Sequence, residues 1–133
     1  MYSIAIAPSN ENILYCGTED GAIFKSTDKG LHWNCVSDFL PANAPVSIAI
    51  DPSNSDVVYV RLSTTILKTT DGGATWSQLS FSGGNAEKII ILPGGRVITV
   101  GATDLYYSDN GGQTWQTGIG INNADQLFDV EAK

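Results

Sequence analysis

Three copies of one eight-residue pattern divide this chain into units of nearly equal length. The copies begin at Ser26, Thr69 and Ser108, so their starts lie 43 and 39 residues apart. Each copy has a hydroxyl residue first, Asp or Asn third, Gly fifth and Trp eighth. The residues at these positions are Ser26, Asp28, Gly30, Trp33, Thr69, Asp71, Gly73, Trp76, Ser108, Asn110, Gly112 and Trp115. A motif that returns at this spacing is typical of a repeat architecture.

The repeat extends beyond this pattern. The segment SIAIAPSN at 3–10 returns as SIAIDPSN at 47–54, and a looser third copy begins at Lys88. Each copy is followed by a run rich in β-branched residues, by a short run that leads into the eight-residue pattern, and by a few residues after the Trp. Each unit therefore predicts four short strands separated by Pro, Gly, Asn and Ser turns. Four-stranded units at a period of about 40 residues are typical of β-propeller blades.

The eight-residue pattern resembles the Asp-box, or BNR repeat, of the sialidase-type β-propeller superfamily. That superfamily includes sialidases, sortilin-type receptors, xyloglucan-cleaving glycosidases and the photosystem II assembly factor. The resemblance implies an all-β chain of three four-stranded antiparallel blades, at about 1–40, 44–82 and 86–121. Residues 127–131 (LFDVE) resemble the first strand of a further unit. We expect 1–133 to be a single three-bladed segment, an incomplete ring unless it associates.

Turn chemistry explains the pattern. Hairpin turns need residues that tolerate positive φ, which suits the glycines. An Asp or Asn side-chain oxygen accepts backbone N–H bonds in such a turn, and the Trp ring covers it. In the resembling family this hairpin lies at the outer rim, so we predict a structural role. Cation binding by the aspartates is the alternative, which Asn110 weakens because an amide is a poorer ligand for hard cations. The single histidine, His32, is expected to be a solvated turn residue.

Composition excludes several classes of partner. The net charge is −7 with only seven Lys and Arg residues, too few and too scattered to neutralise a nucleic-acid backbone or to favour an anionic membrane. The sequence shows no sustained helical period, no secretory signal and no membrane span. No phosphate-binding loop or metal-ligand spacing is present, so we predict no cofactor and no metal. The compartment stays open.

The two cysteines are predicted to be free thiols. The repeat register places Cys16 on the second strand of its unit and Cys35 on the fourth. Two strand spacings separate them by about 9.5 Å, beyond the reach of a disulfide.

Catalytic residues are difficult to assign. Sialidases use three arginines on the substrate carboxylate, and this chain has only Arg61 and Arg96. Xyloglucanase-type glycosidases need two carboxylates that face each other at about 5–9.5 Å. The candidates include Asp51, Asp56, Asp104 and Asp129, and no spacing selects a pair. We therefore predict no catalytic residues and a non-enzymatic module that binds protein or glycan. The alternative is a fragment of a glycan-active enzyme, sialidase- or xyloglucanase-like.

The first strands are apolar on both faces, so both faces need cover. Three blades form only an arc, whereas propellers close with about 4–8 blades. We expect self-association to complete the ring, most simply as a homodimer of six blades. A longer parent protein is the alternative.

Overall fold

The computed structural model describes residues 3–37, 47–62, 65–81, 86–101 and 105–118. These residues form twelve strands and no helix. The strands are β1 (Ser3–Ile6), β2 (Leu14–Gly17), β3 (Ile23–Ser26), β4 (Asn34–Ser37), β5 (Ser47–Asp51), β6 (Asn54–Arg61), β7 (Ile66–Thr69), β8 (Ser77–Leu79), β9 (Ala86–Ile91), β10 (Val97–Gly101), β11 (Leu105–Ser108) and β12 (Gln116–Thr117).

The strands build three four-stranded antiparallel sheets, each paired in chain order. We call them blade 1 (β1–β4), blade 2 (β5–β8) and blade 3 (β9–β12). The predicted all-β fold with three four-stranded blades is confirmed. The division of the chain as one segment of 1–133 stays a prediction, and the extra strand expected at 127–131 lies outside the described residues.

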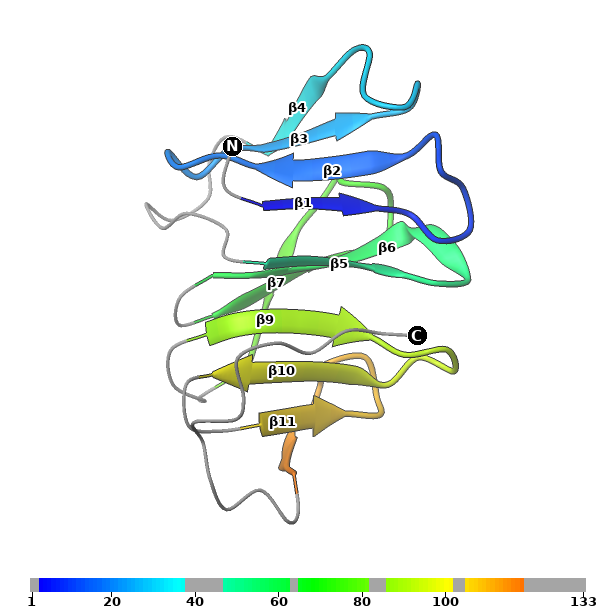
Figure 1. Cartoon of the computed structure of the whole chain (residues 1–133). Helices are drawn as coiled ribbons and strands as arrows, with labels where there is room; N and C mark the ends of the chain where they lie inside the picture. Colours follow the sequence, from blue (N-terminus) through cyan, green and yellow to red (C-terminus); the bar gives the residue numbers. More distant parts are fainter. Residues whose placement is uncertain (1–2, 38–46, 63–64, 82–85, 102–104, 119–133) are drawn as a thin grey trace.

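The first strands of the three blades lie side by side, β1 next to β5 and β5 next to β9 (Figure 1). Because neighbouring strands are antiparallel, the β1–β2 and β3–β4 connections of a blade fall at one end of its sheet. This end carries the three Asp-box turns, 26–33, 69–76 and 108–115, and we call it the box end. The first strands begin at the opposite end, where the β2–β3 connections also lie.

Two apolar clusters join the blades. Alternation along β5 explains both, because Ile48 and Ile50 face blade 1 whereas Ala49 faces blade 3. The first cluster contains Ala7, Tyr15, Ile23, Ile48, Ile50, Val58, Val60, Leu62 and Leu67. The second contains Ala49, Tyr59, Ile66, Ile89, Ile91 and Val97. The core of the molecule therefore lies between sheets and consists of side chains from two blades at a time.

The strand register of blade 1 shows why the two cysteines do not form a disulfide. Cys16 on β2 and Cys35 on β4 both pair with Phe24 on the intervening strand β3. Both cysteines are free; Cys16 is buried and Cys35 is exposed. The prediction of two free thiols on the second and fourth strands is confirmed.

Candidate functional site

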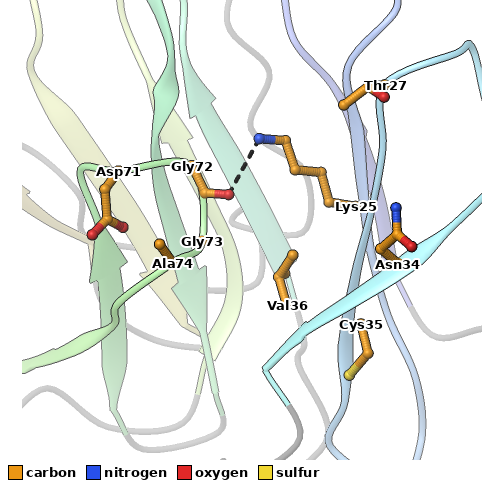
Figure 2. Close-up of a pocket in the computed structure, with 9 residues that line it drawn as sticks. All are labelled: Lys25, Thr27, Asn34, Cys35, Val36, Asp71, Gly72, Gly73 and Ala74. Carbon is orange, nitrogen blue, oxygen red and sulfur yellow. Dashed lines mark hydrogen bonds between the residues drawn. The ribbon is translucent and has the colours of Figure 1, made fainter.

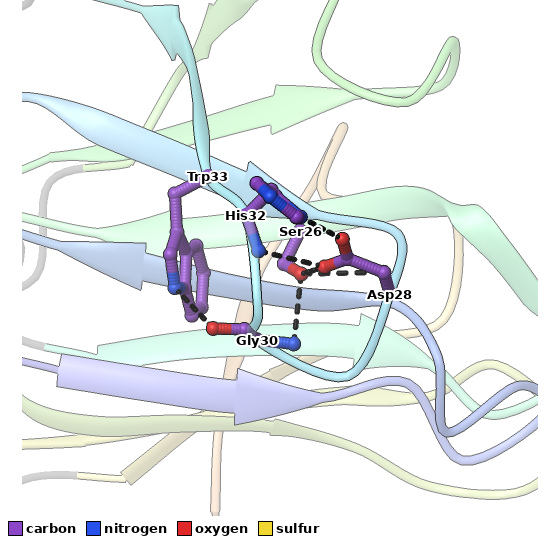
Figure 3. A network of polar contacts seen from close by, with 5 residues as sticks. All are labelled: Ser26, Asp28, Gly30, His32 and Trp33. Carbon is purple, nitrogen blue, oxygen red and sulfur yellow. Dashed lines mark hydrogen bonds and ion pairs between the residues drawn. The ribbon is translucent and has the colours of Figure 1, made fainter.

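The first Asp-box turn is held by two side-chain oxygens (Figure 3). The Ser26 hydroxyl oxygen accepts the Gly30 N–H at 2.8 Å, and the hydroxyl donates to Asp28 Oδ1 at 2.9 Å. Asp28 Oδ1 also accepts the His32 N–H at 2.8 Å. The Trp33 indole N–H donates to the Gly30 carbonyl at 3.0 Å, which places the ring over the turn. Gly30 has φ +91°, which explains the glycine at this position.

The second turn repeats this arrangement. The Thr69 hydroxyl oxygen accepts the Gly73 N–H at 3.0 Å. Asp71 accepts the Thr75 N–H at 2.9 Å and the Thr75 hydroxyl at 2.6 Å. The Trp76 indole differs, because its N–H donates to the Val36 carbonyl of blade 1 at 3.3 Å. This tryptophan therefore joins two blades, whereas Trp33 bonds within its own turn.

The third turn makes the same bonds with an amide. The Ser108 hydroxyl oxygen accepts the Gly112 N–H at 2.9 Å, and Asn110 Oδ1 accepts the Thr114 N–H at 3.0 Å. The Asn110 amide nitrogen donates to the Thr114 hydroxyl at 2.7 Å, and the Trp115 indole donates to the Gly112 carbonyl at 3.1 Å. These are the contacts that a turn role requires; that the boxes are purely structural stays a prediction.

Hydrogen bonds depress the pKa of both box aspartates. The backbone N–H and ring of His32 lower the pKa of Asp28 to about 2. The hydroxyl and backbone N–H of Thr75 lower that of Asp71 to about 2. The His32 ring nitrogen lies 2.6 Å from Asp28 Oδ2, a pairing that the sequence analysis did not anticipate, although His32 is exposed as expected. The available signal was the position of His32 within its box, which is occupied by Thr75 and Thr114 in the other two boxes.

A lysine crosses each boundary between blades, and sequence reasoning missed both. The Lys25 ammonium of blade 1 lies 5.5 Å from the centre of the Tyr15 ring and donates to the Gly72 carbonyl of blade 2 at 3.2 Å (Figure 2). In the same way Lys68 lies 5.1 Å from the Tyr59 ring and donates to the Gly111 carbonyl of blade 3 at 3.1 Å. The available signal was a lysine just before the box in the first two units.

A groove of about 430 Å³ runs along the boundary between blades 1 and 2 at the rim (Figure 2). Its lining residues are Lys25, Thr27, Asn34, Cys35, Val36, Asp71, Gly72, Gly73 and Ala74. Its two charged groups already have partners, because Lys25 binds the Gly72 carbonyl and Asp71 binds Thr75. The groove thus follows the joint between blades.

The two arginines occupy separate environments. Arg61 is buried at the end of β6, its guanidinium 4.4 Å from the centre of the Phe81 ring, and burial lowers its pKa to about 10. Arg96 is exposed and makes a bidentate pair with Asp109, at 2.7 and 3.0 Å. Neither arginine is therefore placed as an exposed group that could bind the carboxylate of a substrate without giving up its present contact.

The carboxylates divide between the two ends of the blades. At the box end Asp28 and Asp71 hold turns, Asp51 accepts the Ser53 N–H at 2.8 Å, and Asp109 pairs with arginine. Glu19 and Asp20 are exposed at the opposite end, in the β2–β3 turn. The Thr18 hydroxyl donates to Asp20 and is the main cause of its lowered pKa.

Within the described ranges, no three His, Cys, Asp or Glu side chains gather to hold a metal ion. No helix in the same part of the chain is long and apolar enough to cross a membrane. Asp104 and Asp129 lie outside the described residues.

Two curated proteins share sequence with this chain. A xyloglucanase of Hypocrea jecorina is 29% identical over 96 residues, which cover 59% of this chain and 12% of that protein. A probable oligoxyloglucan-reducing end-specific xyloglucanase of Neosartorya fischeri is 29% identical over 82 residues, which cover 57% of this chain and 10% of that protein. The chain thus spans about a tenth of the length of these relatives. No family model matches it.

Solved structures establish the fold. A GH74 enzyme of Niastella koreensis superposes with a TM-score of 0.73 at 23% identity, covering 86% of this chain and 20% of the enzyme. YCF48 from Cyanidioschyzon merolae superposes with a TM-score of 0.73 at 21% identity, covering 87% of this chain and 36% of that protein. The chain has the β-propeller fold.

The comparisons correct one expectation. The sequence analysis predicted a non-enzymatic chain, and that prediction is wrong, because the similar sequences are xyloglucanases and GH74 enzymes are among the similar structures. The physical reason is that the two carboxylates of a glycosidase need only face each other in space. Their absence as a pattern within three units was therefore no argument against catalysis.

Proposed function

We propose that this chain is part of a xyloglucan-cleaving glycoside hydrolase of the β-propeller type, to which it contributes three blades. The observation that carries the proposal is the sequence identity with two xyloglucanases over more than half of the chain. The fold agrees with it, because a GH74 enzyme superposes over 86% of this chain. The Asp-box relationship inferred from the repeated turns belongs to the same proposal.

The opposite end of the blades, not the box end, is the end that faces the polysaccharide. At the box end the carboxylates of Asp28, Asp71 and Asp109 already accept hydrogen bonds from their own turns or from arginine. Glu19 and Asp20 stand exposed in the β2–β3 turn. Asp20 accepts the Thr18 hydroxyl through Oδ1, and its exposed carboxylate still offers acceptor positions to sugar hydroxyls or to a reacting glycosidic bond.

Asp20 fits one of the two carboxylate roles in glycoside hydrolysis. Its lowered pKa keeps it ionised, as a nucleophile or a general base requires. The general acid needs a raised pKa, which burial or a neighbouring carboxylate provides. That second group is expected from another blade, about 5–9.5 Å across the cleft.

The test measures release of reducing ends from xyloglucan, with unsubstituted cellulose as the comparison substrate. Binding of xyloglucan is measured in parallel by calorimetry. We expect binding and release with xyloglucan, and about a 100-fold loss of kcat or more in Asp20→Asn. The control is Asp109→Asn, another exposed carboxylate, at the box end, which should leave kcat unchanged.

Two results would count against the proposal. If the protein neither binds nor cleaves xyloglucan, the assignment of substrate class is refuted. Unchanged cleavage by Asp20→Asn and by Glu19→Gln would place the reacting carboxylates away from this turn.

A further inference from the structure

The third Asp-box contains the one Asn–Gly step of the sequence, Asn110–Gly111. An asparagine before a glycine is prone to deamidation, because the backbone nitrogen of the glycine attacks the side-chain amide and no Cβ atom obstructs it. Asn110 is exposed and Gly111 is half-buried, so water and hydroxide reach this step. Deamidation in the folded chain therefore depends on whether the Gly111 nitrogen is available for attack.

The equivalent backbone N–H is bonded in the other two boxes. In the second box the Gly72 N–H donates to the Asp56 carbonyl at 3.0 Å, and in the first box the Lys29 N–H donates to the Asn12 carbonyl at 3.1 Å. Among the described residues, no group accepts a hydrogen bond from the Gly111 N–H. The third box thus differs from the other two in leaving this nitrogen free to react.

The length of one turn explains the difference. In blade 2, seven residues connect Ile50 to its strand partner Val58, and the acceptor Asp56 is one of them. In blade 3, only five residues connect Ile91 to its strand partner Val97. The shorter connection between β9 and β10 brings none of its carbonyls within hydrogen-bond range of the third box.

The side-chain amide is already polarised toward attack. Asn110 Oδ1 accepts the Ser108 hydroxyl at 2.9 Å and the Thr114 N–H at 3.0 Å. Negative charge develops on this oxygen when a nucleophile adds to Cγ, and donors that are already in place stabilise it. The Lys68 ammonium donates to the Gly111 carbonyl at 3.1 Å, so a positive charge stands beside the residue whose nitrogen must lose its proton.

We propose that Asn110 is a deamidation site of the folded chain and is converted to aspartate. Hydroxide removes the Gly111 N–H proton, and the nitrogen forms a bond to Asn110 Cγ. The Cγ–Nδ2 bond breaks, and Nδ2 leaves as ammonia with a proton from water, which regenerates hydroxide. Water then adds to Cγ of the cyclic imide, the N–Cγ bond breaks and the nitrogen regains a proton. The net reaction consumes one water and releases one ammonia.

An aspartate at this position has the partners that it needs. Asp71, the equivalent residue of the second box, accepts the Thr75 N–H at 2.9 Å and the Thr75 hydroxyl at 2.6 Å. Thr114 offers the same two groups in the third box. The conversion therefore adds one negative charge at the box end of blade 3 and preserves the turn. It stands apart from the proposed activity and does not depend on it.

The test is peptide mapping by mass spectrometry of the folded chain after incubation at mildly alkaline pH. Asp71→Asn supplies a matched control in the same molecule, because it creates a second Asn–Gly–Gly sequence whose first glycine N–H is bonded to Asp56. We expect deamidation at position 110 to be about tenfold faster or more than at position 71, since the bonded nitrogen must first leave its acceptor. Circular dichroism checks that the variant is folded.

The same variant in guanidinium chloride distinguishes the effect of the fold from that of the sequence. Both positions should then deamidate at similar rates, because both are followed by two glycines. Equal rates at the two positions in the folded variant would overturn the proposal. So would a folded wild-type chain in which Asn110 stays intact while the denatured chain is converted. Asn110→Asp reproduces the product and should keep the wild-type strand spectrum and Tm; loss of folding would contradict the fit of aspartate in this box.

Discussion

Gly73 tests whether the box turns hold neighbouring blades together. It lies in the box of blade 2 with φ +95°, and a Cβ atom there would lie 3.0 Å from Cβ and 3.1 Å from Cγ2 of Val36 in blade 1. Gly95, in the turn between β9 and β10, has φ +97°, and a Cβ atom there would meet nothing within 4 Å. The two glycines therefore share a backbone conformation and differ in their surroundings.

The expected destabilisation follows from this comparison. An alanine in the left-handed region costs about 1–2 kcal/mol at either position. Gly73→Ala must also displace Val36, whose carbonyl accepts the Trp76 indole N–H, and overpacking of this kind costs about 1–3 kcal/mol. The free energy of unfolding should thus fall further in Gly73→Ala than in Gly95→Ala, by about 1–3 kcal/mol. In a domain of this size that corresponds to about 4–12 °C in Tm.

Urea unfolding followed by circular dichroism, with thermal scans in parallel, measures the difference. Both variants should keep the wild-type spectrum at low denaturant. Equal destabilisation by the two substitutions would refute the argument, since it would mean that Val36 and blade 1 do not press on the box turn of blade 2.

Three further predictions concern single residues. Trp76→Ala should lower the free energy of unfolding by about 3–5 kcal/mol in urea titrations, and Trp33→Ala by less, because Trp76 packs in the first apolar cluster and bonds across blades, whereas Trp33 bonds within its own turn. The pKa of Asp71 is about 2 in the folded chain and about 3.9 when unfolded, so its contribution to stability is complete above pH 4 and is lost as the pH falls toward 2. Asp71→Asn should therefore show a smaller loss of stability than the wild type in that pH window, in acid unfolding curves. Parallel curves for the variant and the wild type would contradict this. A thiol reagent should find two free thiols in the denatured, unreduced chain, with exposed Cys35 reacting before buried Cys16 in the native one; a count of zero would contradict the strand register.

The fold could be predicted from the sequence because its signals are local and repeated three times. The positions of Gly30 and Trp33 within their box identify a hairpin, and the apolar runs beside it identify the strands. The same register placed Cys16 and Cys35 on the second and fourth strands of blade 1, where the structure has them. One unit alone would have been weak support for this prediction, whereas three in register fixed the strand order.

The contacts between blades could not be predicted in this way. Lys25 reaches a carbonyl 47 residues later in the chain, and Lys68 one 43 residues later, so each contact depends on how two sheets pack. Catalytic carboxylates are equally difficult to predict from sequence, because their relation to each other also depends on how the sheets pack. Asp20 stands exposed in a turn, and no spacing in the sequence pairs it with a second carboxylate.

Asn110 distinguishes between the two interpretations of the Asp-boxes, as structural turns or as cation sites. Its amide oxygen accepts the Thr114 N–H at 3.0 Å, which corresponds to the bond from the Thr75 N–H to Asp71 at 2.9 Å. Where the second carboxylate oxygen of Asp71 accepts the Thr75 hydroxyl, the Asn110 amide nitrogen donates to the Thr114 hydroxyl. The turn therefore keeps its shape without a negative charge. A cation site would lose its charged ligand at this box, so the three boxes share only the turn geometry. This favours boxes that fix the turn at the rim of each blade.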